Sequence, residues 1–218
     1  MEEEIILGRD GNQPFTIKAE MNGVSRQHAK ITIMDNGNWY LEDLDSSNGT
    51  FIRDEETGDF ISVNKRIIIT PMTFILLGPD NSKGCCFFAK QAVSFGDFTE
   101  DYEYLDSKAN EFETEIAQIK KIEKTMNIVK TALPFAIFGL SLILIPGEGT
   151  MQMLIRMGSA AIPSVLIQLF YNTSSKEEAI KSKQDKFSHC PNPLCSNKMK
   201  TKDIHNLKCP KCKKIKNK

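Results

Sequence analysis

The sequence SRQHAKITIMDNGNWYLEDLDSSNGTFI, residues 25–52, decides the fold of the N-terminal part of this 218-residue chain. It alternates short apolar runs with turns rich in Asp, Asn, Ser and Gly, and the same pattern continues on both sides. The runs are residues 5–7, 29–34, 39–41, 50–52, 67–70, 74–77 and 85–89. Short strands at this spacing predict an all-β sandwich over residues 1–93. Cys85 and Cys86 fall in the last run, where we interpret them as small buried side chains.

Three loops between these runs carry polar side chains: GR at 8–9, SRQH at 25–28 and DSSNGT at 45–50. In this order and at these separations they resemble the forkhead-associated (FHA) domain, whose motif is GR, then SRxH, then an NG turn. The resemblance covers roughly residues 5–93. It implies a module that binds phosphothreonine in a protein partner. One departure is that many FHA domains have two more strands before GR, whereas only seven residues precede Gly8 here.

The resemblance also implies a role for each matching residue. Arg9 presents a planar fork of donors to the phosphate oxygens, which a lysine cannot match. Ser25 donates its hydroxyl to the same phosphate, and Arg26 adds charge or a backbone contact. Asn48 hydrogen-bonds the main chain of the bound peptide. Ser47 stands where many members have Thr.

Three further matching residues, Gly8, His28 and Gly49, are expected to shape the binding loops. Gly49 takes the left-handed conformation that the turn needs. His28 corresponds to the family's structural histidine, which holds the loops from inside. The alternative is that the loops only close a sandwich, with Arg9 and Arg26 as solvated charges.

Residues 98–130 predict one long helix with a polar face, because they contain no proline and no glycine. Apolar residues follow alternating four and three spacing at Leu105, Ala109, Phe112, Ile116 and Ile119. Such a coiled-coil-like seam either packs on its own protein or joins two copies into a homo-oligomer.

The next segment predicts a transmembrane α-helical hairpin over residues 131–171. Residues 131–147 carry no charge and residues 151–171 carry only Arg156, which can snorkel to the membrane interface. A buried soluble hairpin is the alternative. Lysines flank both segments, at 120, 121, 124 and 130 and at 176, 181, 183 and 186, whereas the connecting loop carries only Glu148. The positive-inside rule therefore predicts an integral membrane protein with N- and C-terminal domains in the cytoplasm, in contact with anionic lipids.

After a lysine-rich linker, residues 172–188, the chain ends in a segment that resembles a zinc ribbon, residues 189–218. Two close cysteine pairs, Cys190 with Cys195 and Cys209 with Cys212, are spaced as ligands of one structural Zn²⁺. We expect the cysteines to have hardly any apolar core around them, so that zinc supplies the folding free energy of the segment. His189 and His205 flank the cysteines and are expected at the surface or behind the ligands.

Charge separates these regions. Residues 1–98 hold 9 Lys and Arg against 15 Asp and Glu, whereas residues 173–218 hold 13 against 4. The sequence shows no catalytic constellation, so we predict a membrane-anchored adaptor, with the zinc ribbon as a second interaction module, and not an enzyme. Two alternatives stay open: a structural part of a membrane or secretion assembly whose FHA-like domain binds protein without phosphate, and a membrane-tethered nucleic-acid binder acting through the zinc ribbon.

Overall fold

A computed structural model describes residues 2–80, 83–144, 147, 149–170, 174–195 and 197–213, with only the backbone at 160, 161 and 163–170. The expected loop residue Glu148 and the end of the expected ribbon, 214–218, lie outside the described residues. The chain forms two compact units. The first combines Met1–Asn110 with Lys183–Lys218, and the second is Glu111–Ser182.

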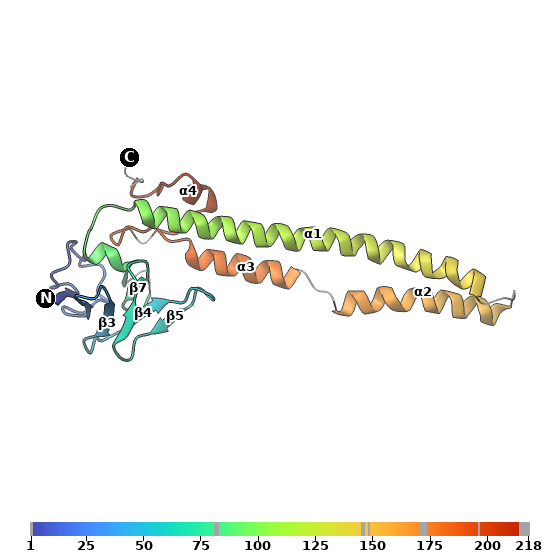
Figure 1. Ribbon diagram of the computed structural model, residues 1–218, viewed down its shortest axis with the longest axis horizontal. Helices are drawn as coiled ribbons and strands as arrows, with labels where there is room; N and C mark the ends of the chain where they lie inside the picture. The colour runs from blue at the N-terminus through green and yellow to red at the C-terminus, as the bar shows by residue number, and fades with distance from the viewer. Residues whose placement is uncertain are drawn as a thin grey trace. The chain divides into compact units, whose positions relative to one another are not determined.

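The first unit contains a sandwich of two four-stranded antiparallel sheets (Figure 1), which confirms the predicted fold of the N-terminal domain. One sheet has the order β1 (Glu3–Leu7), β2 (Ala29–Ile33), β3 (Trp39–Asp43) and β6 (Ile67–Ile69). The other has the order β5 (Phe60–Ser62), β4 (Thr50–Arg53), β7 (Phe74–Leu77) and β8 (Cys85–Phe88).

The sequence analysis missed strand β5. It has three residues and pairs only with β4, in a register that places Phe60 opposite Arg53. Only Phe60 and Ile61 of this strand are apolar, whereas the equally short β6 consists of three isoleucines and was recognised.

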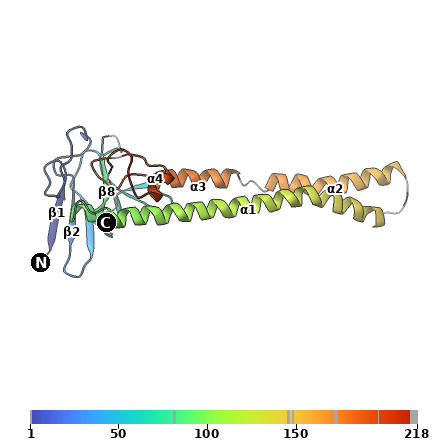
Figure 2. The same ribbon diagram turned by 90° about the horizontal axis from the view of Figure 1, so that it is seen from above.

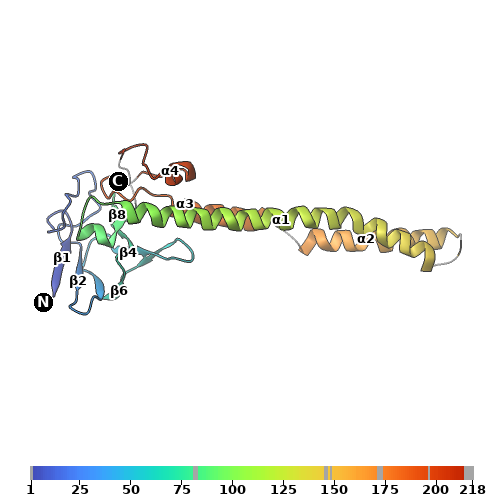
Figure 3. The same cartoon turned by 45° about the horizontal axis from the view of Figure 1, so that its top comes forward.

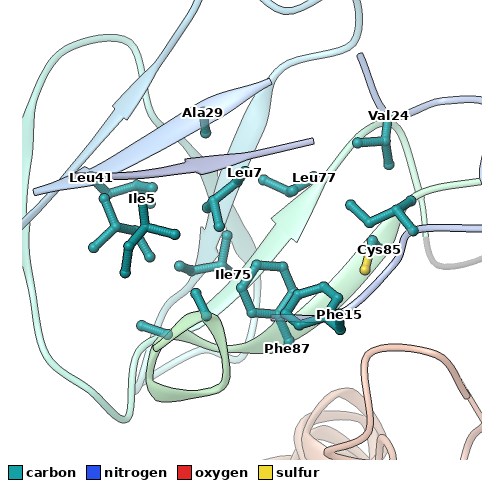
Figure 4. Packing of buried hydrophobic residues seen from close by; sticks show 14 of the residues in the cluster. Ile5, Leu7, Phe15, Val24, Ala29, Leu41, Ile75, Leu77, Cys85 and Phe87 are labelled. Atoms are coloured by element: carbon teal, nitrogen blue, oxygen red, sulfur yellow. The ribbon is translucent and has the colours of Figure 1, made fainter. Parts of the chain in front are cut away.

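The main core lies between the two sheets (Figure 4) and contains Leu7, Leu41, Ile75, Leu77 and Phe87. The irregular chain between β1 and β2 adds four more buried apolar residues: Phe15, Ile17, Met21 and Val24. The core is therefore completed by a segment with no regular secondary structure.

A second apolar cluster covers the opposite face of the sheet that contains β7 and β8. The first turns of α1 (Thr99–Leu144), which follows η1 (Ala89–Ala92), and the cysteine segment pack there. In Figure 3, α4 (Thr201–His205) lies beside these turns of α1. The expectation that the cysteines have hardly any apolar core around them is thus wrong, because the sandwich and α1 supply that core.

Helix α1 joins two segments that the sequence analysis separated at residue 130. It runs without a break to Leu144 and includes Pro134 (Figure 2). Leu105, Ala109 and Phe112, the first half of the expected seam, are buried within the chain. Toward its C-terminal end the apolar side chains are exposed, with 80% of Phe135 accessible. Among the described residues, α1 is the one helix that passes as long and apolar enough to cross a membrane.

Two more helices follow in the chain, α2 (Thr150–Phe170) and α3 (Ser174–Phe187). The second falls in the expected lysine-rich linker. Four Lys and two Glu in its 14 residues favour helix, and Lys181 pairs with Glu177 one turn earlier at 2.7 Å. The lysine-rich segment expected to be a linker thus forms a helix from Ser174 to Phe187.

Candidate functional site

The first two polar loops are bonded to each other through their backbones. The Arg9 N–H donates to the Ser25 carbonyl (3.1 Å), and the Asp10 N–H donates to the Arg26 carbonyl (2.9 Å). Gly8 makes this approach possible, because its φ is 155° and a Cβ there would lie 2.2 Å from the Arg26 carbonyl oxygen. No other residue type fits at this position without moving one loop.

His28 joins the second loop to the third. Its ring is fully buried, and Nδ1 accepts a hydrogen bond from the Ser25 N–H (2.9 Å). Since Nδ1 is the acceptor, the proton is on Nε2, which donates to the Gly49 carbonyl (2.9 Å). Burial lowers the pKa of His28 and so favours this neutral tautomer.

The third loop is built on Asp43, which the sequence analysis did not single out. Its carboxylate accepts hydrogen bonds from the backbone N–H (2.9 Å) and the hydroxyl (2.7 Å) of Ser46, and from the Thr50 hydroxyl. Burial opposes ionisation, but these hydrogen bonds outweigh it and lower the pKa of Asp43. The signal in the sequence was an aspartate three residues before a serine, a spacing typical of a side chain that organises a turn.

The same network holds the glycine of the turn. The Gly49 N–H donates to the Ser46 hydroxyl (3.0 Å), and its φ of 81° is in the left-handed region, as expected from the NG sequence.

The remaining candidate residues lie on these connected loops. The Ser25 hydroxyl accepts from the Ser47 N–H (3.2 Å), and the Asn48 amide donates to the Gly23 carbonyl (2.9 Å). Arg9 and Arg26 are exposed, and in the described part of the chain their guanidinium groups form no ion pair and no hydrogen bond. The loops therefore present unpaired cationic donors and a hydroxyl at one end of the sandwich, a combination that can bind an anion.

The four cysteines near the C-terminus form a second candidate site. Their sulfur atoms all lie within 4.8 Å of one another, with Cys190 to Cys212 and Cys195 to Cys209 each at 3.7 Å. Four thiolates at the Zn–S distance of about 2.3 Å in a tetrahedron are separated by about 3.8 Å. The group therefore fits a tetrahedral metal ion, and 3.7 Å is far longer than a disulfide bond.

Polar groups contact Cys209, one of the four cysteines. The Asn197 amide approaches the Cys209 sulfur at 3.8 Å, and the Cys209 N–H donates to the Tyr102 hydroxyl (3.1 Å). His189 and His205 are not in the group of ligands: the first contacts the Lys186 carbonyl, and the second contacts Asp106. Burial raises the pKa of Cys195 to about 11, so binding of a metal ion by this thiol would displace a proton.

Comparison with known proteins identifies the loop-bearing part of the chain. The family model of the FHA domain matches residues 5–77. Similar solved structures include the FHA domain of the CT664 protein from Chlamydia trachomatis, which is 26% identical, covers 35% of this chain and 70% of its own, and has a TM-score of 0.29. Another is an engineered FHA with the Myc-pTBD peptide, which is 21% identical and has a TM-score of 0.30. The match covers 43% of this chain and 73% of that chain. No curated protein matches the chain.

The neutral state of His28 generates a prediction about pH. Because its pKa is lowered in the folded chain, the unfolded chain gains a proton at a higher pH than the folded chain does. The free energy of unfolding should therefore fall as pH decreases below about 6.5, down to the pKa of the folded state. In His28→Gln this part of the pH dependence should be absent, and stability at pH 7.5 should be lower by about 1–3 kcal/mol.

The measurement is urea unfolding of the full chain in detergent between pH 5 and 7.5. It is followed by the fluorescence of Trp39 in β3, the only tryptophan of the chain. Carboxylates titrate in both proteins, so the difference between the two pH curves isolates His28. Parallel curves would contradict the assigned tautomer.

Proposed function

Residues 5–77 of this chain are an FHA domain, a binding module, and from this premise we propose that the protein is an adaptor for phosphothreonine-containing proteins. The proposed ligand-binding residues are Arg9, Ser25, Arg26, Ser47 and Asn48. The observation that carries the proposal is that Arg9 and Arg26 are exposed and unpaired, within the described residues, on loops that His28 and Gly8 fix against each other.

Local donors, and not the overall field of the domain, have to supply the affinity. A threonine phosphate carries close to two negative charges near pH 7, and residues 1–98 have a net charge of −6. General electrostatics therefore repels the ligand. Hydrogen bonds from charged groups, each contributing about 1.5–3 kcal/mol, overcome this repulsion only at the loops.

For Asn48 the proposed partner is the peptide backbone. One N–H of its side-chain amide donates to the Gly23 carbonyl, and this bond supports the orientation of the amide. In the proposal, the amide oxygen and the second N–H bind a peptide main chain, which offers one donor and one acceptor per residue.

The first prediction from this proposal concerns Arg9. Arg9→Ala should weaken binding of a phosphothreonine peptide by about tenfold or more, because one charge-assisted hydrogen bond is lost. Lys30→Ala is the matched control: it also removes one positive charge from the domain, but from a lysine that is already paired with Glu4 at 2.9 Å. Its effect should stay within about twofold.

The peptides are taken from proteins that the chain captures from a lysate and no longer captures after phosphatase treatment. Calorimetry then measures the affinity of both variants for these peptides. Phosphoserine should bind more weakly than phosphothreonine, because it lacks a methyl group worth about 1 kcal/mol when buried. If unmodified threonine binds equally well, or Arg9→Ala has no effect, the protein is instead an FHA-containing structural component whose partner needs no phosphate.

We also propose that residues 131–171 anchor the protein in a membrane as a helical hairpin. Exposed Phe135 and Ile143 on α1 and Leu154 on α2 support this, since such side chains need an apolar solvent. On α2 the Arg156 guanidinium donates to the Gly147 carbonyl (3.2 Å), toward the start of the helix. A charge in that place lies near the end of a membrane segment, where it is tolerated.

The second prediction tests insertion and orientation. The chain should resist carbonate extraction, and in vesicles with the cytoplasmic face outward a protease should reach both termini. Leu140→Arg should impair insertion, because an arginine near the middle of a span costs about 2.5–3.5 kcal/mol. Ile122→Arg, on the same helix but before the apolar segment, should insert normally. Protection of either terminus would contradict the proposed topology.

For the cysteine centre we propose one structural Zn²⁺ bound by Cys190, Cys195, Cys209 and Cys212. Four thiolates leave no open position on a tetrahedral ion, so the metal holds the segment together and does not activate water. The sulfur separations of 3.7 Å support this coordination.

The third prediction is one zinc per chain in reduced, freshly purified protein, measured by elemental analysis. Cys209→Ser should lower zinc affinity strongly, because it removes one of four ligands. Cys86→Ala is the matched control, since Cys86 is equally buried but lies outside the group of ligands, and it should retain one zinc. A zinc content near zero in the unmodified protein would remove the zinc site from the proposal.

A further inference from the structure

The four-cysteine segment, residues 189–213, is packed on the FHA domain of its own chain within one compact unit. Three of its candidate metal ligands belong to the same apolar cluster as the outer face of β7 and β8 and the first turns of α1. The members of this cluster are Phe74, Leu76, Cys86, Phe88, Phe98, Tyr102, Leu105, Ala109, Cys190, Cys195, Met199, Ile204 and Cys209. The ligands are therefore buried by the sandwich as well as by their own segment.

Polar contacts connect the segment to two different elements of the domain. On α1, Tyr102 accepts the hydrogen bond from the Cys209 N–H, and one turn later Asp106 contacts His205 Nδ1 at 2.6 Å. On β8, the Cys85 thiol approaches the Pro193 carbonyl at 3.6 Å. These contacts involve the metal-ligand loop itself and not only the chain around it.

The end of α3 is held on the β4–β5 hairpin. The Arg53 guanidinium lies between the rings of Phe74 and Phe187, 4.2 Å and 4.3 Å from their centroids. Lys186 pairs with Asp59 at 2.7 Å. A Cβ on Gly58 would lie 2.8 Å from the Phe187 ring, so the hairpin is shaped to receive it.

From these contacts we propose that the partner of the four-cysteine segment is the FHA domain of its own chain, and that the metal ion bound by its four thiolates holds it there. The segment then acts as a clasp: it ties the chain returning from residues 111–182 to the sandwich from which α1 departs. This inference rests on the proposed zinc site and is independent of phosphopeptide binding.

The clasp implies reciprocal coupling. If the metal binds only the folded, docked segment, its binding free energy also stabilises the surface on which the segment is docked. By linkage, weakening that surface must weaken metal binding by the same factor. A zinc ribbon that served as a separate docking module would show neither effect.

The test uses the full reduced chain in detergent in three states: loaded with zinc, stripped by a chelator, and reloaded. In the stripped protein, hydrogen exchange should show loss of protection by about tenfold or more in β8 and in residues 99–109 of α1. Strands β2 and β3, in the other sheet, should change by less than about twofold. Reloading should restore the protection.

A pair of tyrosine variants tests the reverse direction. Tyr102→Phe removes the hydroxyl that accepts from the Cys209 N–H, and zinc affinity measured by chelator competition should fall by about tenfold. Tyr104→Phe makes the same change two residues along α1, where the hydroxyl contacts Glu55 instead, and should leave affinity within about twofold.

The outcomes separate this inference from the proposed zinc site. Zinc that binds and leaves without changing protection in β8 and α1, or equal affinities of the two variants, would overturn the clasp while the zinc site stands. A chain that binds no zinc would overturn both.

Discussion

Strands β7 and β8 are apolar on both faces, and the organisation of the first unit depends on this constraint. Residues Ile75, Leu77, Cys85 and Phe87 face the other sheet, while Phe74, Leu76, Cys86 and Phe88 point away from it. Leaving four such side chains in water costs about 1.5–3 kcal/mol for each large one. A two-layer sandwich cannot cover its own outer face. The first turns of α1 and the cysteine segment cover it, which explains why residues separated by about 100 positions share one core.

In the three polar loops, buried polar groups fix the backbone, and the exposed side chains of Arg9 and Arg26 are not needed for this. His28 forms hydrogen bonds with Ser25 and Gly49, and Asp43 forms hydrogen bonds with Ser46 and Thr50. All four partners lie inside the loop cluster. Arg9 and Arg26 contribute only backbone groups to the loop cluster, and in the described part of the chain their side chains take no part in this network. Because the framework is satisfied without them, either arginine can be replaced without loss of a buried contact. The loops are therefore organised before any ligand binds, which lowers the entropy cost of binding.

The sequence could predict features that depend on neighbouring residues, and it failed where distant segments meet. Turn residues between apolar runs located seven of the eight described strands, and the spacing of two cysteine pairs located the four sulfur atoms that lie together. Strand β5 was missed because it has only two apolar residues, Phe60 and Ile61, whereas β6 has the same length but three isoleucines. The docking of the cysteine segment was missed for another reason, although a signal existed: FILL at 74–77 and CCFF at 85–88 are continuously apolar and do not alternate. Such runs indicate strands buried on both faces, and so a third layer.

This third layer changes how the parts of the chain cooperate. If the cysteine segment were an independent module, its charged surface would be a second docking site beside the phosphate-binding loops. Instead, Cys190, Cys195 and Cys209 are buried in one cluster with Phe88, Tyr102 and Leu105, so this face of the cysteine segment is already occupied. The exposed residues Arg9, Arg26 and Asn48 on the polar loops are not part of this buried cluster. The outer face of this sheet thus packs against the two chain segments that lead to residues 111–182.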